Sequence, residues 1–278
     1  MLTVLFRLHR LGPPTKIQSK AIPCVLRTQD IVAQAPSIQE RIQSYIVPAI
    51  QMICSAAAQA TAEGGSSAPK GVQILVVTAT VDQAAQAQRL SVGLGGSLGI
   101  RTSLCVGQGD LQQDLATFLK APPHVLVGTP QRLLDLFAMR TLPVTDIRLL
   151  VIDECDQLIA RNLSDYVANL VRLLPPSGVG APGSPTASRS PMLGGGLGLP
   201  GSFGETGSAF SMQSSSTFNA AASGRQTVLL SCTCPQDVLQ VAFFHRSNDA
   251  DDARVQELCV VPPAARASSR SRASRRRR

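Results

Sequence analysis

Five short apolar runs constrain the fold of this chain more than any other feature. Each is four to six residues long, rich in branched side chains and without regular polar alternation. They lie at residues 31–34, 72–77, 124–127, 149–152 and 227–230. Runs of this kind are typical of strands that are buried on both faces, as in a parallel sheet. Segments with helical periodicity separate the runs, and this alternation predicts an α/β sandwich.

One helical segment is marked by apolar residues that recur at intervals of three to four positions. They are Ile159, Leu163, Val167, Leu170 and Leu174. The pattern predicts a single helix that ends at Pro175-Pro176, because proline cannot continue a helix.

We also expect the run at residues 149–152 to form an inner strand, flanked by the strands that begin near Val125 and Thr227.

Two carboxylates, Asp153 and Glu154, directly follow one of the apolar runs. Thr129 and Ser231 follow two others, and ligands of open α/β sheets bind beyond the carboxyl ends of the strands. An acidic pair at a strand end can hold Mg²⁺ and orient an attacking water in phosphoryl transfer. A solvated strand end would carry the same residues. The phosphoryl-transfer interpretation predicts that Asp153 lies within side-chain reach of residues 35–42, the segment that directly follows the first apolar run.

Several sequence blocks, in this order, resemble those of the DEAD-box RNA helicases. The blocks are Pro14-Thr15-Lys16-Ile17-Gln18 with Ala21-Ile22-Pro23, Asp30-Ile31-Val32-Ala33-Gln34-Ala35, Val127-Gly128-Thr129-Pro130-Gln131-Arg132, Asp153-Glu154-Cys155-Asp156 and Ser231-Cys232-Thr233. Residues 226–230 and 235–239 are most similar to the translation-initiation factor 4A branch. The resemblance covers Gly12 to Pro175 and Arg225 to about Val261.

The resemblance implies an α/β fold with a single RecA-like domain of the P-loop NTPase type, ATP and Mg²⁺ as cofactors, and ATP-dependent unwinding of RNA. It assigns Gln18 to adenine, Ser37 and Arg41 to the phosphates, Asp153 to Mg²⁺ through water, Glu154 to the attacking water, Thr129 and Arg132 to RNA, and Ser231 and Thr233 to coupling between the two sites. Components of translation initiation or of other ribonucleoproteins are the implied partners. We expect a monomer without membrane association.

The phosphate loop departs from the family pattern at every residue that would grip phosphate. Ile38 and Glu40 stand at the two glycine positions, Arg41 replaces the lysine, and Ile42 lacks the hydroxyl for Mg²⁺. A branched side chain resists the left-handed backbone of a tight phosphate turn, and a guanidinium is not equivalent to an ammonium. Losing two or three charge-assisted hydrogen bonds costs about 5 kcal/mol. We therefore predict weak or absent binding of ATP and Mg²⁺, and little or no hydrolysis.

Other features weaken the expected motor further. The segment at residues 79–84 lacks the arginine of the matching RNA-contacting block, and the second RecA-like domain of the family has no counterpart here. Residues 266–278 contain seven Arg and no acidic residue, and so carry seven of the eight net positive charges of the chain. We expect RNA binding of low specificity, driven mainly by this tail. A solvated tail without a partner is the alternative.

Composition divides the chain into four parts. Residues 1–175 form the first part of the RecA-like domain, 176–224 a long disordered insertion rich in Gly, Ser and Pro, 225–262 the last strand and helix, and 263–278 a disordered Arg/Ser tail. A shorter insertion near residues 56–70 is expected to lengthen a loop. Seven Cys without a secretory signal fit a reducing compartment. We expect a cytoplasmic protein, with a nuclear one as the alternative that the tail allows.

Two other classes of function remain open from the sequence. One is a non-catalytic module that keeps the fold as a surface for protein or RNA. The other is a fragmentary gene model of an initiation factor 4A-like helicase. Measured nucleotide binding separates the enzyme from the module.

Overall fold

The computed structural model describes residues 12–36, 39–62, 71–107, 110–140, 142–176 and 224–233, together with a strand at 259–261. By its internal contacts the chain divides into two units, residues 1–179 with 224–278, and residues 180–223. The second unit lies outside the described residues, as do residues 1–11 and the tail. The four-part division of the chain therefore stays a prediction.

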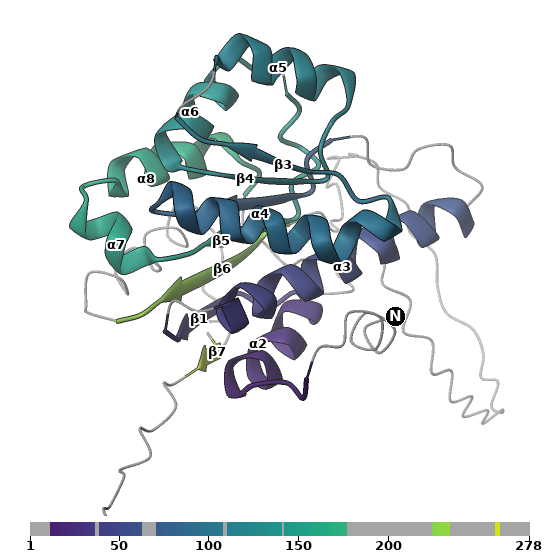
Figure 1. Cartoon of the computed structure of the whole chain (residues 1–278), viewed down its shortest axis with the longest axis vertical. Coiled ribbons are helices and arrows are strands. Elements are labelled where there is room, and N and C mark those ends of the chain that lie inside the picture. The colour runs from purple at the N-terminus through teal and green to yellow at the C-terminus, as the bar shows by residue number, and fades with distance from the viewer. Residues whose placement is uncertain are drawn as a thin grey trace, which may run out of the picture. The chain divides into compact units, whose positions relative to one another are not determined.

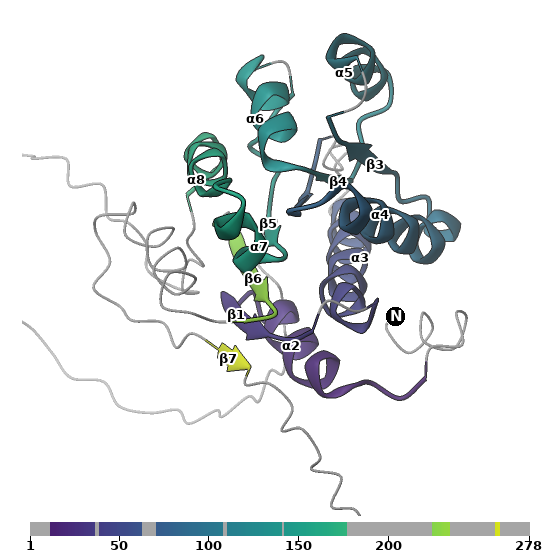
Figure 2. The same cartoon turned by 60° about the vertical axis from the view of Figure 1, so that its left-hand side comes forward.

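The first unit contains a sheet of seven strands in the order β3-β4-β2-β5-β6-β1-β7, and every neighbouring pair is parallel. The strands are β1 (Ile31–Gln34), β2 (Ile74–Val77), β3 (Thr102–Cys105), β4 (Val125–Gly128), β5 (Leu149–Ile152), β6 (Gln226–Ser231) and β7 (Cys259–Val261). Figures 1 and 2 show the strands side by side with helices on both faces. The predicted α/β fold with a parallel sheet is confirmed.

Two details of the predicted sheet need correction. β5 is an inner strand, but it lies between β2 and β6, and β4 is one strand farther away. Apolar runs identify buried strands without fixing their order, so the flanking strand expected from Val125 was wrong. The apolar runs also did not predict β3, because this edge strand is half-exposed and carries polar Thr102 and Ser103.

Eight helical segments accompany the sheet within the described residues. They are α2 (Lys16–Leu26), α3 (Gln39–Ala62), α4 (Val81–Gly95), η1 (Gly96–Leu98), α5 (Leu111–Lys120), α6 (Pro130–Ala138), α7 (Cys155–Ala160) and α8 (Ser164–Leu173). The single helix expected between Ile159 and Leu174 is in fact α7 and α8, because Asn162 adopts a left-handed backbone with φ of 56° between them. Residues 56–62, expected in a loop, extend α3.

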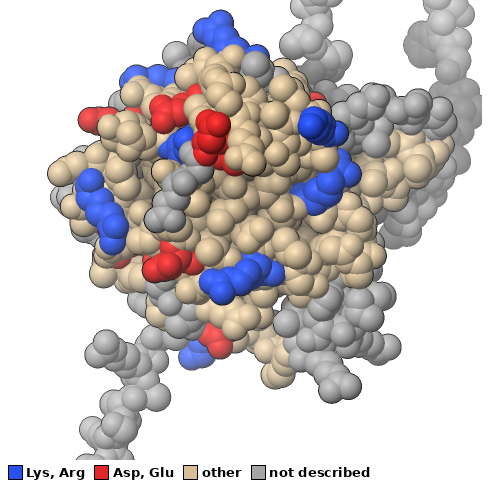
Figure 3. All heavy atoms as spheres, turned by 45° about the horizontal axis from the view of Figure 1, so that its top comes forward, with Lys and Arg blue, Asp and Glu red and all other residues tan. Residues whose placement is uncertain are grey.

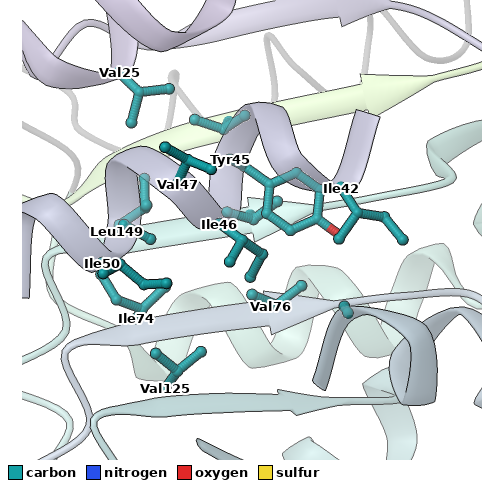
Figure 4. Packing of buried hydrophobic residues seen from close by; sticks show 14 of the residues in the cluster. Val25, Ile42, Tyr45, Ile46, Val47, Ile50, Ile74, Val76, Val125 and Leu149 are labelled. Carbon is teal, nitrogen blue, oxygen red and sulfur yellow. The ribbon is translucent and has the colours of Figure 1, made fainter. Parts of the chain in front are cut away.

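The sheet separates two apolar layers. On one face α2, α3 and α4 pack against Leu149 and Val151 of β5, and on the other α6, α7 and α8 pack against Leu150 and Ile152. Figure 4 shows Tyr45 and the neighbouring apolar residues of α3 turned toward the sheet. None of the helices in the described part of the chain combines the length and apolar character needed to cross a membrane. α3 therefore carries side chains directly onto the strands whose ends form the candidate site.

Candidate functional site

A buried arginine on α3 joins the ends of three strands. One terminal nitrogen of Arg41 lies 2.9 Å from Oδ1 of Asp153, directly after β5, and 3.9 Å from Oε1 of Glu154. The other donates to the carbonyl oxygen of Ala35 after β1, at 2.9 Å, and to Sγ of Cys232 after β6, at 3.1 Å. The side chains of Arg41 and Asp153 are both 0% exposed. The predicted proximity of Asp153 to residues 35–42 is confirmed.

The Asp153 carboxylate accepts from four donors. Oδ1 accepts from Arg41 and from the backbone N–H of Glu154, at 2.9 Å each. Oδ2 accepts from the Tyr45 hydroxyl at 3.1 Å and from Nε2 of Gln83 at 3.0 Å. An ionised carboxylate offers about four lone-pair positions. The described side chains and backbone therefore use the full accepting capacity of Asp153.

Burial controls the protonation of this cluster. It raises the pKa of Asp153 above the usual range, although the Arg41 guanidinium and three hydrogen-bond donors act in the opposite direction. Burial alone would lower the pKa of Arg41, but the charge of Asp153 and the contact with Cys232 raise it overall, so the guanidinium stays cationic. Burial and the nearby Asp153 charge raise the pKa of Tyr45 well above its usual value, which keeps its hydroxyl a donor.

Glu154 occupies an unusual backbone position at the start of α7. Its φ of 59° and ψ of 45° place it in the left-handed region, which costs a residue other than glycine on the order of 1–3 kcal/mol. Its Oε2 accepts from the hydroxyl of Thr80, at 3.4 Å, at the N-terminus of α4. The residue is 8% exposed, so its carboxylate lies mostly inside the protein beside Arg41.

The amide of Gln18, the residue assigned to adenine, already has protein partners on both sides. Its Oε1 accepts from the backbone N–H of Thr15 at 3.1 Å, which holds the start of α2. Its Nε2 donates to Oε1 of Gln43 at 2.8 Å and to the carbonyl oxygen of Glu40 at 3.2 Å. Gln18 thus fastens α2 to the first turns of α3. Ser37, assigned to the phosphates, lies outside the described residues.

The two residues assigned to coupling connect β6 with α7. The backbone N–H of Asp156 donates to Oγ of Ser231 at 3.2 Å, and this hydroxyl donates to the carbonyl oxygen of Thr233. The Thr233 hydroxyl in turn donates to Oδ2 of Asp156 at 3.1 Å. These bonds extend the contact between β5 and β6 beyond the strand ends.

Thr129 and Arg132, assigned to RNA, lie at the start of α6. Thr129 precedes the helix, and Arg132 forms a partly exposed ion pair of 3.0 Å with Asp114 on α5. Seen from the side of α5 and α6, charged side chains of both signs stand among uncharged residues in Figure 3. Asp110, Asp114 and Asp135 accompany Arg132 in this part of the sequence. The surroundings of the predicted RNA contact are therefore not uniformly basic.

Sequence reasoning missed three residues of the cluster: Tyr45, Gln83 and Cys232. Tyr45 follows Arg41 by one helical turn, and residues four apart share one face of a helix. That spacing was a usable signal, but it becomes informative only once Arg41 is known to point inward. Gln83 and Cys232 lie within the matched blocks, where their side chains had no assigned role.

Comparison with known proteins gives one consistent result. Residues 15–241 match the family model described as DEAD/DEAH box helicase. The chain is 31% identical over 164 residues to ATP-dependent RNA helicase eIF4A of Schizosaccharomyces pombe, covering 59% of this chain and 38% of that protein. It is 30% identical to eukaryotic initiation factor 4A of Drosophila melanogaster, covering 59% of this chain and 37% of the relative. The chain thus spans less than two-fifths of the length of these relatives.

Solved structures are similar in fold. A DEAD box protein from the hyperthermophile Methanococcus jannaschii matches with a TM-score of 0.61 at 18% identity, over 87% of this chain and 50% of that one. S. cerevisiae Dbp5, in a complex that contains ADP, matches with a TM-score of 0.59 at 18% identity, over 88% of this chain and 49% of that one.

Proposed function

Because the chain belongs to the DEAD/DEAH box helicase family, we propose that it provides an RNA helicase domain whose nucleotide site is filled by its own side chains and hydrolyses ATP weakly or not at all. Family membership implies the use of ATP, Mg²⁺ and RNA in general. The proposal concerns how this particular chain departs from that pattern.

The Arg41–Asp153 pair is the observation that carries the proposal. Asp153 is the carboxylate that the resemblance assigns to Mg²⁺, yet all its accepting positions are used and a fixed cation stands beside it at 2.9 Å. A metal ion or its bound water would have to displace one of these donors. Breaking a buried ion pair leaves an uncompensated charge and costs roughly 3–5 kcal/mol. The residues present therefore do not fit a magnesium-bound nucleotide.

The surroundings of the pair support the same conclusion. Glu40 lies exposed in the first turn of α3, where its negative charge interacts favourably with the helix dipole but would repel a triphosphate. Ile42 is 1% exposed and contributes to the apolar core instead of offering a hydroxyl to a metal. Gln18, held by Thr15, Glu40 and Gln43, would have to give up existing bonds to contact a base.

ATP turnover and binding by the purified chain test the proposal. We expect no RNA-stimulated ATPase activity above background, and a Kd for Mg–ATP weaker than about 1 mM. The variant I38G/E40G/R41K/I42T restores the family residues at the phosphate loop and should gain measurable affinity. Turnover by the unaltered chain that disappears in E154Q would refute the proposal and restore the enzyme.

RNA binding is a separate part of the proposal, and it rests on charge. The tail at residues 266–278 carries seven Arg, whereas Arg132 in the domain is already paired with Asp114. Each Arg that neutralises a phosphate adds close to one unit to the salt dependence on duplex nucleic acid. We propose binding of low specificity, mainly through this tail.

Filter binding across a salt series tests that assignment with three proteins. The full-length chain and a variant with all seven tail Arg changed to Lys should bind alike, with a steep salt dependence. A 1–262 truncation should bind much more weakly to single- and double-stranded RNA. If the truncation binds as tightly as the full-length chain, the domain itself contains the RNA interface.

The relatives named initiation factor 4A favour partners from translation initiation. We include such partners in the proposal, together with a cytoplasmic location and a monomeric state. A non-catalytic module that binds protein or RNA through the same fold is the second candidate, and the buried Arg41–Asp153 pair favours it over an active motor. Co-purification with initiation components, compared between the unaltered chain and the 1–262 truncation, tests whether such partners depend on the domain or the tail.

A further inference from the structure

Arg41 connects parts of the fold that are distant in sequence. Its guanidinium contacts the chain after β1 through the Ala35 carbonyl, after β5 through Asp153, and after β6 through Cys232. These strands are neighbours in the order β5-β6-β1. One planar group thus spans the carboxyl ends of three adjacent strands, which only a forked donor can do.

A second set of contacts extends from the carboxylates. Asp153 accepts from Gln83 of α4, and Glu154 accepts from Thr80, the N-cap of the same helix. Asp156, two residues after Glu154, bonds to Ser231 at the end of β6 and to Thr233 beyond it. The hydrogen bonds of the cluster therefore extend to residues 79–84 and 231–233, two segments that are not part of the phosphate loop.

Burial makes this arrangement cooperative. The side chains of Arg41 and Asp153 are 0% exposed, so water cannot replace a lost partner without local opening. Removing one charge leaves the other uncompensated in a medium of low polarity. The three strand ends and the start of α4 are therefore expected to keep or lose their arrangement together.

We infer that Arg41 acts as an internal ligand of the domain. The inference rests on the proposed function and concerns the regulation of the same site. The Arg41 guanidinium fixes the ends of β1, β5 and β6 and the N-terminus of α4 in a single arrangement. Neither nucleotide nor Mg²⁺ changes this arrangement. The segments at residues 79–84, 153–156 and 231–233 are thereby uncoupled from nucleotide. Arg41 is a positioning residue in this role.

Hydrogen exchange of the full-length chain, with and without Mg–ATP, tests the inference. In the unaltered chain, protection of the three segments should be the same in both conditions. Arg41→Ala should lower protection there by at least about 100-fold, with a smaller change in β2 and β4. Arg172→Ala is the matched control, because this arginine is exposed on α8 and donates to the Asn169 side chain of the same helix. It should leave all three segments unchanged.

Arg41→Lys and Cys232→Ala keep the test decisive if Arg41→Ala does not fold. Lysine retains the charge beside Asp153 but cannot reach three strand ends, so protection should fall mainly at residues 231–233. Cys232→Ala removes a single contact and should lower protection in that segment alone. Uniform protection in both variants, equal to that of the unaltered chain, would overturn the inference.

Chemical rescue adds a readout that a purely structural arginine elsewhere would not give. Dilute guanidinium chloride should raise protection in Arg41→Ala and not in Arg172→Ala, because the ion has the same charge and shape as the group that Arg41→Ala removes from beside the two carboxylates. Restoration by magnesium chloride alone would contradict the inference, since any cation would then suffice.

ATPase activity in the unaltered chain would overturn the proposed function, whereas the comparison of Arg41→Ala with Arg172→Ala would still decide the role of Arg41.

Discussion

Two arginine–aspartate pairs of nearly equal length occupy different environments in this domain. Arg41 and Asp153 are 2.9 Å apart with both side chains fully buried, whereas Arg132 and Asp114 are 3.0 Å apart and 13% and 28% exposed. The first pair lies where the family's nucleotide site is expected, and the second includes Arg132, one of the residues expected to contact RNA. Distance alone would give the two pairs equal weight.

Burial makes the difference between them. A partly exposed pair contributes roughly 0–1 kcal/mol, since water and salt screen it and either partner can be resolvated. A buried pair need not stabilise the fold relative to apolar residues, but removing one partner is costly because the other charge stays in the interior. Substitution of a charged residue should therefore be costly at the strand ends around Asp153 and well tolerated at the contact between α5 and α6.

The largest predicted effect is the loss of Arg41. Arg41→Ala should lower the free energy of unfolding by about 3–5 kcal/mol, because the Asp153 carboxylate would remain buried without a counter-charge. Urea denaturation followed by circular dichroism measures the change. A loss below about 1 kcal/mol would mean that water reaches Asp153 and that the two pairs are energetically alike.

A double-mutant cycle sharpens this comparison. Arg41→Met and Asp153→Asn should each destabilise the domain, but the double variant should be more stable than the sum of the single losses predicts, by more than about 1 kcal/mol. The reason is that removing both charges leaves no buried ion unpaired. The same urea denaturation gives all four values. Strict additivity would show that Tyr45 and Gln83, and not the ion pair, set the energetics around Asp153.

The contrast between the two regions also shows what the sequence could predict. The apolar runs that became β1, β2, β4, β5 and β6 were recognisable because buried parallel strands are continuously apolar. The position of Asp153 at a strand end followed from the same pattern. One neighbour of β5, the strand from Thr227 that became β6, was predicted correctly. The other neighbour, β2, was not predicted, because each apolar run fits several positions in a sheet.

The internal role of Arg41 could not be read from the sequence either. Resemblance assigned the residue to phosphate, since it stands where the family has lysine, and an arginine in a loop is normally exposed. Only the helical start of α3 at Gln39 turns the side chain toward Asp153. The contacts with Ala35 and Cys232 depend on strands far apart along the chain, and no local pattern records them.

A smaller effect is predicted for the exposed pair. Arg132→Ala should change the free energy of unfolding by less than about 1 kcal/mol, and the difference should shrink as salt concentration rises. Urea denaturation at low and high salt measures both quantities, with Arg172→Ala as a control for loss of a surface charge. A loss comparable to that of Arg41→Ala would remove the distinction between the two regions.

The smallest predicted effect is that of Arg132→Ala on the labelling of Cys105, whose Sγ contacts the backbone of Arg132. Its thiol is fully buried, and its Sγ contacts the carbonyl oxygen of Arg132 at 4.0 Å. Burial, with the nearby charge of Asp114, raises the pKa of Cys105 to about 12, whereas Arg132 acts to lower it. Only the thiolate is alkylated readily, so labelling by iodoacetamide near neutral pH should be about 1,000-fold slower than in the urea-unfolded chain.

Arg132→Ala should leave this labelling slow, because loss of the guanidinium raises the pKa of Cys105 further and an exposed pair contributes little to closure. The modified peptide can be quantified by mass spectrometry in the unaltered chain and in the variant, with the urea-unfolded chain as the reference for complete access. Acceleration toward the unfolded rate in Arg132→Ala would mean that the ion pair holds α5 and α6 closed over β3. In that case the exposed pair, like the buried one, would be a structural requirement of its region.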